Sequence, residues 1–303
     1  MIIVPGSINL DLIAKSNGLP APGQTLSGTH FETAPGGKGA NQALAARRAG
    51  GDVLMVGAVG SDANAAEAIS MLKDADVNLD AVRKIELEEV PTGVALILVD
   101  SVSGENQIVV VPGANGHVHA DDLSGLALND TDFVVLQLEV PSNVVEAALT
   151  IAKKNGAKSL LNIAPFDSSA VGLARKANIT IANETEFDEL AVAMNLQGND
   201  RIEKAKEFCR QTGNIIVVTL GGDGAFAIEG NAIYRANSLP IEPVDTVGAG
   251  DTFCGCLAVA LGEGKSMEEA LAFASAAGSL ACLKNGAQPS IPYRAEIDDA
   301  LNS

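Results

Sequence analysis

Aromatic residues are scarce in this 303-residue chain, which has no tryptophan, two tyrosines and eight phenylalanines. A nucleoside substrate needs an apolar or aromatic slot for its base, so this composition argues against that class of substrate. Basic residues are also few, because 20 lysines and arginines stand against 38 aspartates and glutamates, for a formal net charge of −18. That balance argues against nucleic acid and anionic membranes as partners.

Cysteine and histidine are too sparse for the common metal and disulfide patterns. The cysteines include no C-x-x-C pair, which fits a reducing compartment; they are Cys209, Cys254, Cys256 and Cys282. Cys254 and Cys256 stand two apart on a predicted helix and cannot share a face, so we interpret them as buried small residues. The histidines are too scattered for a metal site or a catalytic triad; they are His30, His117 and His119.

Long apolar runs are absent as well, since none approaches the roughly 18 residues of a membrane span. The chain begins with the strand-like Ile2-Ile3-Val4 and shows no signal peptide, so a cytoplasmic protein is expected. Hydrophobic residues make up 47% of the chain, and there is no internal repeat or long linker. This length allows one large α/β domain or two small ones.

The most informative stretch runs from Asp245 to Phe253. Gly248-Ala249-Gly250 is a small-residue loop, and an apolar helix is expected from Thr252 to Leu261. A helix start leaves backbone N–H groups unpaired and carries partial positive charge, which suits a phosphate or an oxyanion. Asp251 in the first turn then makes sense as a base that deprotonates the attacking group. The alternative is an ordinary helix cap.

Two earlier segments also carry candidate binding groups. Asn9 and Asp11 lie two apart, so in an extended segment they point the same way and can bind a diol. The alternative is a turn held by side-chain hydrogen bonds. Lys38 and Asn41 fall in a glycine-rich run that leads into an alanine-rich helix, where both would face the strand ends. A solvated Lys38 is the alternative.

Hydrophobic runs predict alternating strands and helices. Strands are expected at 53–60, 93–100, 107–112, 132–140, 159–163, 179–182 and 214–220, and helices at 63–75, 142–154 and 267–284. The hairpin around 103–106 interrupts this rhythm, and the segment 10–34 has no helical period. We therefore predict an α/β fold with a mostly parallel central sheet flanked by helices on both faces, plus a small β-sheet standing off it.

Several polar residues fall at or just past predicted strand ends, where ligands bind in such sheets. They are Asn9, Asp11, Glu139, Asn183, Thr219 and Asp251. Asn183 to Glu186 also has the spacing of a helix capping box, which is the structural alternative for Glu186.

These motifs together resemble the ribokinase-like family of sugar and nucleoside kinases. Gly248-Ala249-Gly250-Asp251 is similar to the C-terminal signature of that family, and the run from Gly36 to Ala43 to its N-terminal one. Four further segments resemble the ribokinases within the family, at 6–9, 92–95, 183–186 and 286–290. The resemblance spans essentially the whole chain. It departs at Leu12, where relatives often carry a polar residue, and at 162–166, which bears on substrate preference.

The resemblance implies a role for each matching position. The sugar would be held by Asn9, Asp11, Gly37, Lys38, Asn41, Glu139 and Asp251, with Asp251 as the base. The anion hole would be Gly248, Ala249 and Gly250. ATP would lie against Asn183, Thr219, Leu220, Gly221, Gly222, Asp223, Gly224, Gly250, Asp251 and Ser275. Glu186 would place Mg²⁺ through water, and K⁺ would be enclosed by Asp245, Val247, Ala281, Lys284, Gly286 and Ser290.

The implied fold is a single kinase domain over residues 1–303 with a discontinuous β lid, at about 10–34 plus 90–114, that also forms a homodimer. The implied activity is ATP-dependent phosphorylation of D-ribose at O5. Alternatives are a kinase of 2-deoxyribose, fructose or a nucleoside. A non-catalytic sugar-binding sensor is a further alternative, against which the intact Asp251 argues. A nicotinamide-dependent dehydrogenase ranks lower because no G-x-G-x-x-G follows the first strand.

Overall fold

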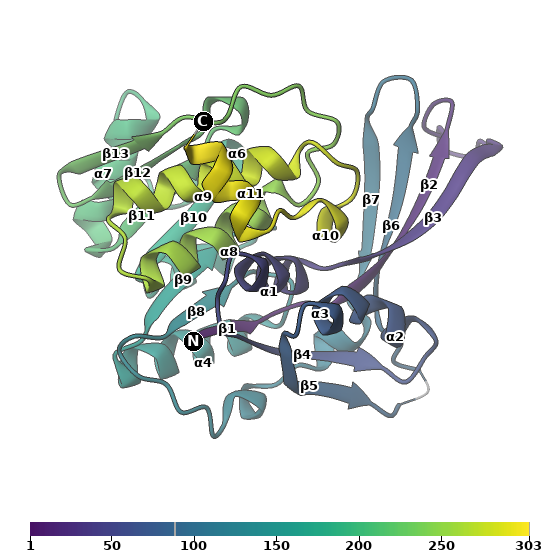
Figure 1. Cartoon of the computed structure of the whole chain (residues 1–303), viewed down its shortest axis with the longest axis horizontal. Helices are drawn as coiled ribbons and strands as arrows, with labels where there is room; N and C mark the ends of the chain where they lie inside the picture. The colour runs from purple at the N-terminus through teal and green to yellow at the C-terminus, as the bar shows by residue number, and fades with distance from the viewer. Residues whose placement is uncertain (88, 303) are drawn as a thin grey trace.

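The computed structural model describes residues 1–87 and 89–302, and its strands there form two sheets (Figure 1). The larger sheet has the strand order β13-β12-β11-β10-β9-β8-β1-β4-β5. Its strands are β1 (Ile2–Pro5), β4 (Val53–Gly60), β5 (Asn78–Ile85), β8 (Phe133–Leu136), β9 (Lys158–Asn162), β10 (Ile179–Asn183), β11 (Ile215–Thr219), β12 (Ala225–Glu229) and β13 (Ala232–Ala236).

In this order, all neighbouring strands from β11 through β1 to β5 pair in parallel. Only β12 and β13, which form a hairpin at one edge, run antiparallel. The predicted fold class is therefore confirmed. The sequence prediction missed β5 and the β12–β13 hairpin, although the Gly230-Asn231 dipeptide between two short apolar runs is a hairpin signal.

Helices cover both faces of the larger sheet. The longer ones are α1 (Lys38–Arg48), α4 (Ser142–Asn155), α6 (Glu184–Ala193), α7 (Arg201–Thr212), α8 (Ala249–Gly262), α9 (Met267–Ala281) and α11 (Arg294–Leu301). Short helices are α2 (Asn64–Ala68), α3 (Ser70–Asp74), α5 (Ala170–Ala174) and α10 (Ala287–Ser290), with 3₁₀ turns η1 (Gly113–His117), η2 (Ala120–Leu123) and η3 (Gly221–Asp223).

Successive side chains of β1 point to opposite faces of the larger sheet and pack into different hydrophobic cores. Ile2 and Val4 belong to the core under α1, α8 and α9, whereas Ile3 belongs to the core under α4, α6 and α7. Figure 1 shows α1, α8, α9 and α11 on the near side of the sheet. Each face therefore has its own hydrophobic core.

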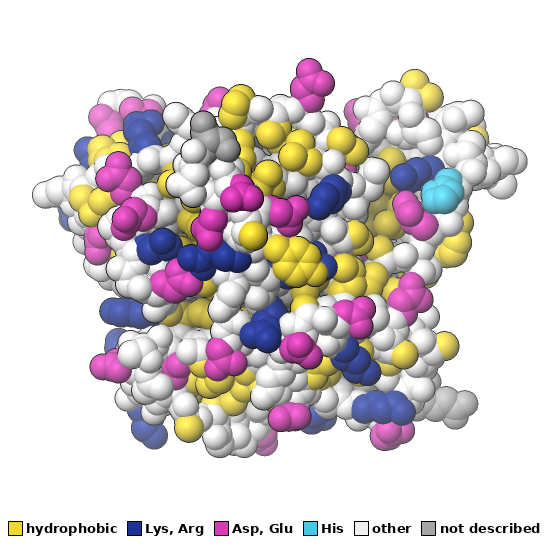
Figure 2. Space-filling model, viewed as in Figure 1, with side chains coloured by type: hydrophobic (Ala, Val, Ile, Leu, Met, Phe, Trp, Pro, Cys, Tyr) yellow, Lys and Arg dark blue, Asp and Glu magenta, His cyan; other side chains and the backbone are white. Residues whose placement is uncertain are grey.

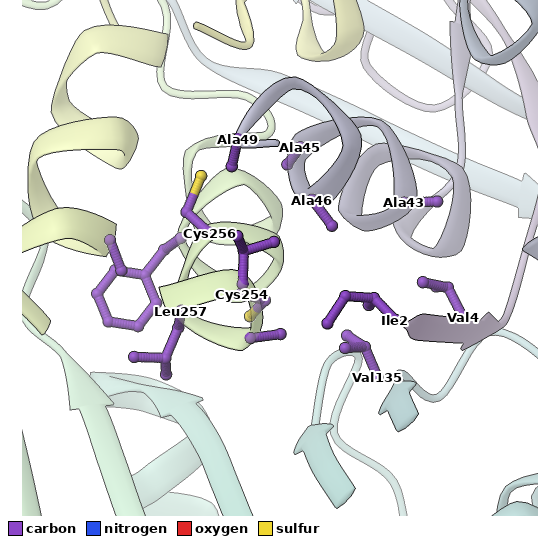
Figure 3. Close-up of a cluster of buried hydrophobic side chains, with 14 of the residues drawn as sticks. Ile2, Val4, Ala43, Ala45, Ala46, Ala49, Val135, Cys254, Cys256 and Leu257 are labelled. Carbon is purple, nitrogen blue, oxygen red and sulfur yellow. The ribbon is translucent and has the colours of Figure 1, made fainter. Parts of the chain in front are cut away.

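Helices α1 and α8 pack closely because their facing side chains are small. Figure 3 shows Ala45 and Ala46 of α1, and Ala49 that follows it, beside Cys254 and Cys256 of α8. A Cβ on Gly255 would lie 2.4 Å from the carbonyl oxygen of Gln42, so only glycine allows this approach. Both cysteines are buried, as predicted. The close packing brings the two helix starts together, which matters for the site below.

The smaller sheet has the order β3-β2-β6-β7 and projects from the larger one at the right of Figure 1. Its strands are β2 (Asn9–Ser16), β3 (Gly28–Gly36), β6 (Gly93–Asp100) and β7 (Asn106–Val111). Strand β2 pairs antiparallel with β3 and parallel with β6, and β7 forms the outer edge by pairing with β6. We call this sheet the lid.

Two predicted elements differ in the structure. The helix predicted at 63–75 is divided into α2 and α3 at Ile69, whose φ of −103° and ψ of 2° leave the helical region. The strand predicted at 132–140 ends at Leu136, so Glu139 lies in the following loop. Within the described ranges no helix is long and apolar enough to span a membrane.

Candidate active site

The start of α8 forms the floor of the candidate site. Gly248 caps the helix with φ 78° and ψ −3°, a left-handed conformation that favours glycine. The N–H groups of Ala249 and Thr252 donate to Thr246 O and Gly248 O, whereas those of Gly250 and Asp251 donate to no acceptor among the described residues. Space above the Gly250 Cα is open. Two free donors at a helix start form a site for an anion.

Asp251 sits in this first turn with 6% of its surface exposed, so its carboxylate is buried. Asn41 Nδ2 donates to Asp251 Oδ2 at 2.9 Å, and Gln42 Nε2 donates to Oδ1 at 2.9 Å. Behind Gln42, Gln137 Nε2 donates to Gln42 Oε1 at 3.0 Å. The start of α1 therefore holds the carboxylate that the start of α8 presents.

Asn9 and Asp11 lie two residues apart at the start of β2, where the lid strand leaves the larger sheet, and both are buried. Asn9 Oδ1 accepts a hydrogen bond from Asn115 Nδ2 at 2.7 Å. Asn115 is itself fixed by the Ile8 backbone, since its Oδ1 accepts from Ile8 N at 2.9 Å. The Asn9 amide is therefore oriented with its NH₂ group available to a ligand.

Asp11 rests against the backbone of Gly36 on the neighbouring strand. A Cβ at Gly36 would lie 2.3 Å from Asp11 Oδ2, so the position requires glycine. Burial raises the pKa of the Asp11 carboxyl to about 7, and the nearby charges of Glu139 and Asp251 add to this shift. The ligand-free site thus brings three carboxylates close to one another.

Lys38 is the cation among these carboxylates. The charge of Asp251 raises the pKa of Lys38, against the opposing effect of burial, and Glu139 and Glu186 contribute in the same direction. Glu139 Oε2 accepts from Ser7 Oγ at 2.6 Å and from the Lys38 N–H at 3.0 Å, so Glu139 also caps α1. Its Oε1 takes part in neither bond.

Two adjoining cavities open at the C-terminal edge of the larger sheet. One of about 230 Å³ lies over the α8 start, and its lining includes Lys38, Asn183, Glu186, Gly250 and Asp251. The second, of about 500 Å³, shares Asn183, Thr219 and Gly250 with the first and is also lined by residues of α9. A phosphate-sized group in the first cavity would be continuous with a larger group in the second.

The larger cavity has an apolar wall and few polar groups. Its lining includes Gly221, Gly222 and Gly224 of the turn after β11, and also Ser275, whose buried Oγ has no partner among the described residues. The loop before α8 adds apolar residues that the sequence prediction missed, namely Leu239, Pro240, Ile241 and Pro243. An apolar slot with a few convergent polar groups suits a nucleotide base.

Asn183 and Glu186 form the capping box that the sequence allowed. Asn183 Oδ1 accepts from the Glu186 N–H at 2.9 Å, and Glu186 Oε2 accepts from the Asn183 N–H at 2.9 Å. Burial raises the pKa of Glu186, although the Asn183 N–H opposes the shift. The cap occupies Oε2, while Glu186 still lines the smaller cavity.

Asp245 joins the α8 loop to the turn at 286–290. Its Oδ1 accepts from the Val247 N–H at 3.0 Å, and its Oδ2 accepts from the Gly286 N–H at 2.8 Å. The Lys284 ammonium pairs with Glu296 at 3.4 Å, so this cation is engaged outside the loop pair. In the described part of the chain no group of three or more His, Cys, Asp and Glu residues is arranged to hold a metal.

A sequence profile of the pfkB family carbohydrate kinases matches residues 1–294. The chain belongs to this family. It is 37% identical over 303 residues to the ribokinase of Bacillus subtilis, covering 99% of each chain, and 34% identical over 305 residues to the deoxyribokinase of Salmonella typhi, covering 99% and 98%. The solved structure of Arabidopsis thaliana ribokinase complexed with ribose and ATP superposes with a TM-score of 0.88 at 33% identity, covering 100% of this chain and 98% of that one.

As a carbohydrate kinase, the chain is an ATP-dependent enzyme, and its predicted residues fall into three groups. Asn9, Asp11, Lys38, Asn41, Glu139 and Asp251 gather between the lid and the starts of α1 and α8. Asn183, Thr219, Gly221, Gly222, Gly224, Gly250 and Ser275 line the larger cavity, and Leu220 and Asp223 belong to the same turn. Asp245, Val247 and Gly286 are joined directly, whereas Ala281, Lys284 and Ser290 lie on the segments around them.

The kinase site also contains residues that the sequence did not single out. Gln42, Gln137 and Asn115 support the predicted polar groups, and Asn162 and Thr246 line the smaller cavity. Asn162 ends strand β9, so the strand-end rule would have found it. Gln137 directly follows β8 but lies inside the strand predicted at 132–140, so that rule did not single it out. Asn115 carries no comparable signal, because its partners Ile8 and Asn9 lie more than 100 residues away.

Proposed function

We propose that this carbohydrate kinase phosphorylates D-ribose at O5 from ATP, giving D-ribose 5-phosphate and ADP. The main observation behind this proposal is the position of Asp251. It lies beside two N–H donors at the α8 start that are unpaired among the described residues, and next to the polar groups of the lid strand. Support comes from the B. subtilis relative, a ribokinase, and from the A. thaliana structure, a ribokinase complexed with ribose and ATP.

In this proposal the sugar lies between β2 and the start of α1. Asn9 donates through its NH₂ group, Asp11 accepts hydrogen bonds from ring hydroxyls, and Lys38 donates from the opposite side. The backbone of Gly37 approaches the sugar, and Asn41 and Glu139 contribute their free oxygens. Nearly all of these groups are polar, which matches a free sugar better than a nucleoside.

Phosphoryl transfer then requires alignment and offset of charge. Asp251 accepts the proton of O5 as O5 bonds to the γ-phosphorus, and the bond from that phosphorus to the bridging oxygen breaks, so ADP leaves with the electron pair. The N–H groups of Gly250 and Asp251, with the loop from Gly248, stabilise the equatorial oxygens; one well-placed donor contributes about 3–4 kcal/mol. Closure of the lid over the sugar would exclude water.

Two cations complete the proposal. Mg²⁺ bound with ATP would offset phosphate charge, and Glu186 is the side chain that faces this position, acting through water. For K⁺, the residues present fit, because Asp245 and the turns around Val247, Ala281, Lys284, Gly286 and Ser290 offer carboxylate and carbonyl oxygens while the Lys284 ammonium is paired elsewhere. A cation there would brace the loop that carries the anion hole.

The lid has a second proposed role, as the contact between two copies of the chain in the cytoplasm. Every residue of the edge strand β7 is exposed, including Ile108 at 52% and Val109 at 61%. Figure 2 shows hydrophobic side chains on the lid, together with a few charged side chains and a histidine. An exposed apolar edge strand favours pairing with another strand, and a second lid is complementary to it.

The test is a coupled assay of ADP release with D-ribose, 2-deoxyribose, D-fructose and adenosine. We expect the highest kcat/KM with D-ribose. A higher value with 2-deoxyribose would favour the second candidate, which the 34% identity to a deoxyribokinase supports. A higher value with adenosine would overturn the sugar assignment, and no turnover of any substrate would favour a non-catalytic sugar sensor.

A further inference from the structure

Two fully buried glutamines lie behind Asp251, and the sequence motifs gave them no role. Gln42 belongs to α1, and Gln137 directly follows β8; both are 0% exposed. Burying an amide is unfavourable unless its groups find hydrogen-bond partners. Here the amides bond to one another and to Asp251, with 3.0 Å between the glutamines and 2.9 Å from Gln42 Nε2 to Asp251 Oδ1.

The direction of these hydrogen bonds follows from the chemistry of Asp251. An ionised carboxylate only accepts, so Gln42 must present its NH₂ group to Oδ1 and its oxygen to Gln137. Gln137 must then present its own NH₂ group to Gln42. Asn41 Nδ2 occupies the other oxygen at 2.9 Å. The ionised state of one carboxylate thus fixes the orientation of both glutamines.

This arrangement leaves Gln137 poorly satisfied. Its Oε1 is buried without a partner among the described residues, and its remaining contact, from Nε2 to Val135 O, is long at 3.5 Å. An unpaired buried amide oxygen destabilises the folded state, and an apolar side chain of similar size would not. Core packing therefore does not explain why residue 137 is a glutamine. Its hydrogen bond to the Gln42 amide does.

We propose that Gln42 and Gln137 are positioning residues for Asp251, forming a buried amide chain that keeps its carboxylate turned toward the acceptor hydroxyl. This inference rests on the proposed function, in which Asp251 is the base. The amide chain acts from the side of the carboxylate that faces the core, so it leaves the pocket side to the sugar. Neither glutamine touches the reacting atoms.

The test compares Gln42→Met and Gln137→Met with wild type and with Thr180→Val. Thr180 is fully buried on β10, and among the described residues its hydroxyl bonds only to Ala174 O, at 3.4 Å, so it controls for the loss of a core polar group. We expect Gln42→Met to lower kcat roughly 10- to 100-fold, the scale of one hydrogen bond to a charged group. The KM values for ribose and ATP should hardly change, and the acid limb of the kcat–pH profile should move to higher pH.

Gln137→Met should shift kcat and the pH profile in the same direction but less, while its melting temperature stays at or above that of wild type. Wild-type kcat and pH profile in Gln42→Met would overturn the inference. It would also be overturned if kcat and melting temperature fell together with an unchanged profile, as expected for a structural role. If Gln42→Met does not fold, an unchanged profile in Gln137→Met decides against it. A wild type that phosphorylates no sugar removes the proposed function and this inference with it.

Discussion

On the proposed sugar side of Asp251 the candidate binding groups are side chains that the fold buries, whereas on the proposed nucleotide side they are largely backbone groups of exposed turns. Asn9, Asp11, Asn41 and Asp251 are all at most 9% exposed. In contrast, Asn183, Gly221, Gly222 and Asp223 are exposed in the ligand-free molecule.

This difference follows from how each side is held. The sugar side is fixed by long-range side-chain hydrogen bonds, such as Asn115 to Asn9 and Asn41 to Asp251. The nucleotide side is fixed by local turns, such as Leu220 N–H to Gly224 O at 2.8 Å. Single substitutions should therefore have large effects on the sugar side, and smaller effects on the nucleotide side, where backbone groups do the binding.

The largest effect is expected at Asp251, which both sides share. Asp251→Asn keeps the shape but removes the base, so kcat should fall by about 10²- to 10⁴-fold, the range for loss of general-base catalysis. ATP affinity, measured by calorimetry, should remain. A folded Asp251→Asn variant with near wild-type turnover would exclude Asp251 as the base.

A substitution at Asp11 tests the proposed sugar side alone. If Asp11 accepts two hydrogen bonds from ribose, Asp11→Ala should raise the activation free energy obtained from kcat/KM for ribose by about 3–6 kcal/mol, because each bond to a charged group contributes about 1.5–3 kcal/mol. The ATP affinity should hardly change. In wild type the ribose KM should rise as pH falls below about 7, where the pKa of Asp11 lies in the ligand-free site. An unchanged ribose KM in Asp11→Ala would contradict the assignment.

The same carboxyl should lower the stability of the free protein at neutral pH. The pKa of Asp11 is about 7 in the folded chain, against an ordinary aspartate value of 3.8. Between these values the folded chain binds more protons than the unfolded chain, so the free energy of unfolding falls as pH rises from about 4 to about 7 and then levels off. Asp11→Asn lacks the titrating carboxyl. Its free energy of unfolding, measured by urea unfolding, should therefore exceed that of wild type by up to a few kcal/mol at pH 8 but not at pH 4. Equal differences at both pH values would rule out the raised pKa.

The smallest effect is expected at the cation loop, which acts on the anion hole through the backbone. Replacing Na⁺ with K⁺ should raise kcat a few-fold, and Asp245→Ala should reduce this response because it releases Gly286 from Val247. Lys84→Ala removes an exposed pair with Glu86, at residues outside the proposed K⁺ site, and serves as the matched control. Identical rates in potassium-free buffer would contradict the proposed K⁺ site.

Much of the fold was predictable because its signals are local. Apolar runs gave β4 and β6 at their observed bounds, and the Asn183–Glu186 spacing gave a real helix cap. The prediction was wrong at Ile69, because the apolar pattern of 63–75 continues across the point where the helix is interrupted. It missed β5 because that segment lacks a strong strand pattern. The candidate site was predictable where residues lie in a glycine-rich motif or end a strand.

The sequence by itself determined the chemistry: a glycine loop with a carboxylate at a helix start, a polar pair on one strand, and a composition poor in aromatic and basic residues. Only the tertiary structure decided which groups meet. Gln137 reaches Gln42 across 95 residues, and Asn41 reaches Asp251 across 210. It also decided the charge balance, since the raised pKa of Asp11 comes from burial beside Glu139 and Asp251. Burial and long-range proximity depend on how whole layers pack, and no local pattern along the chain records them.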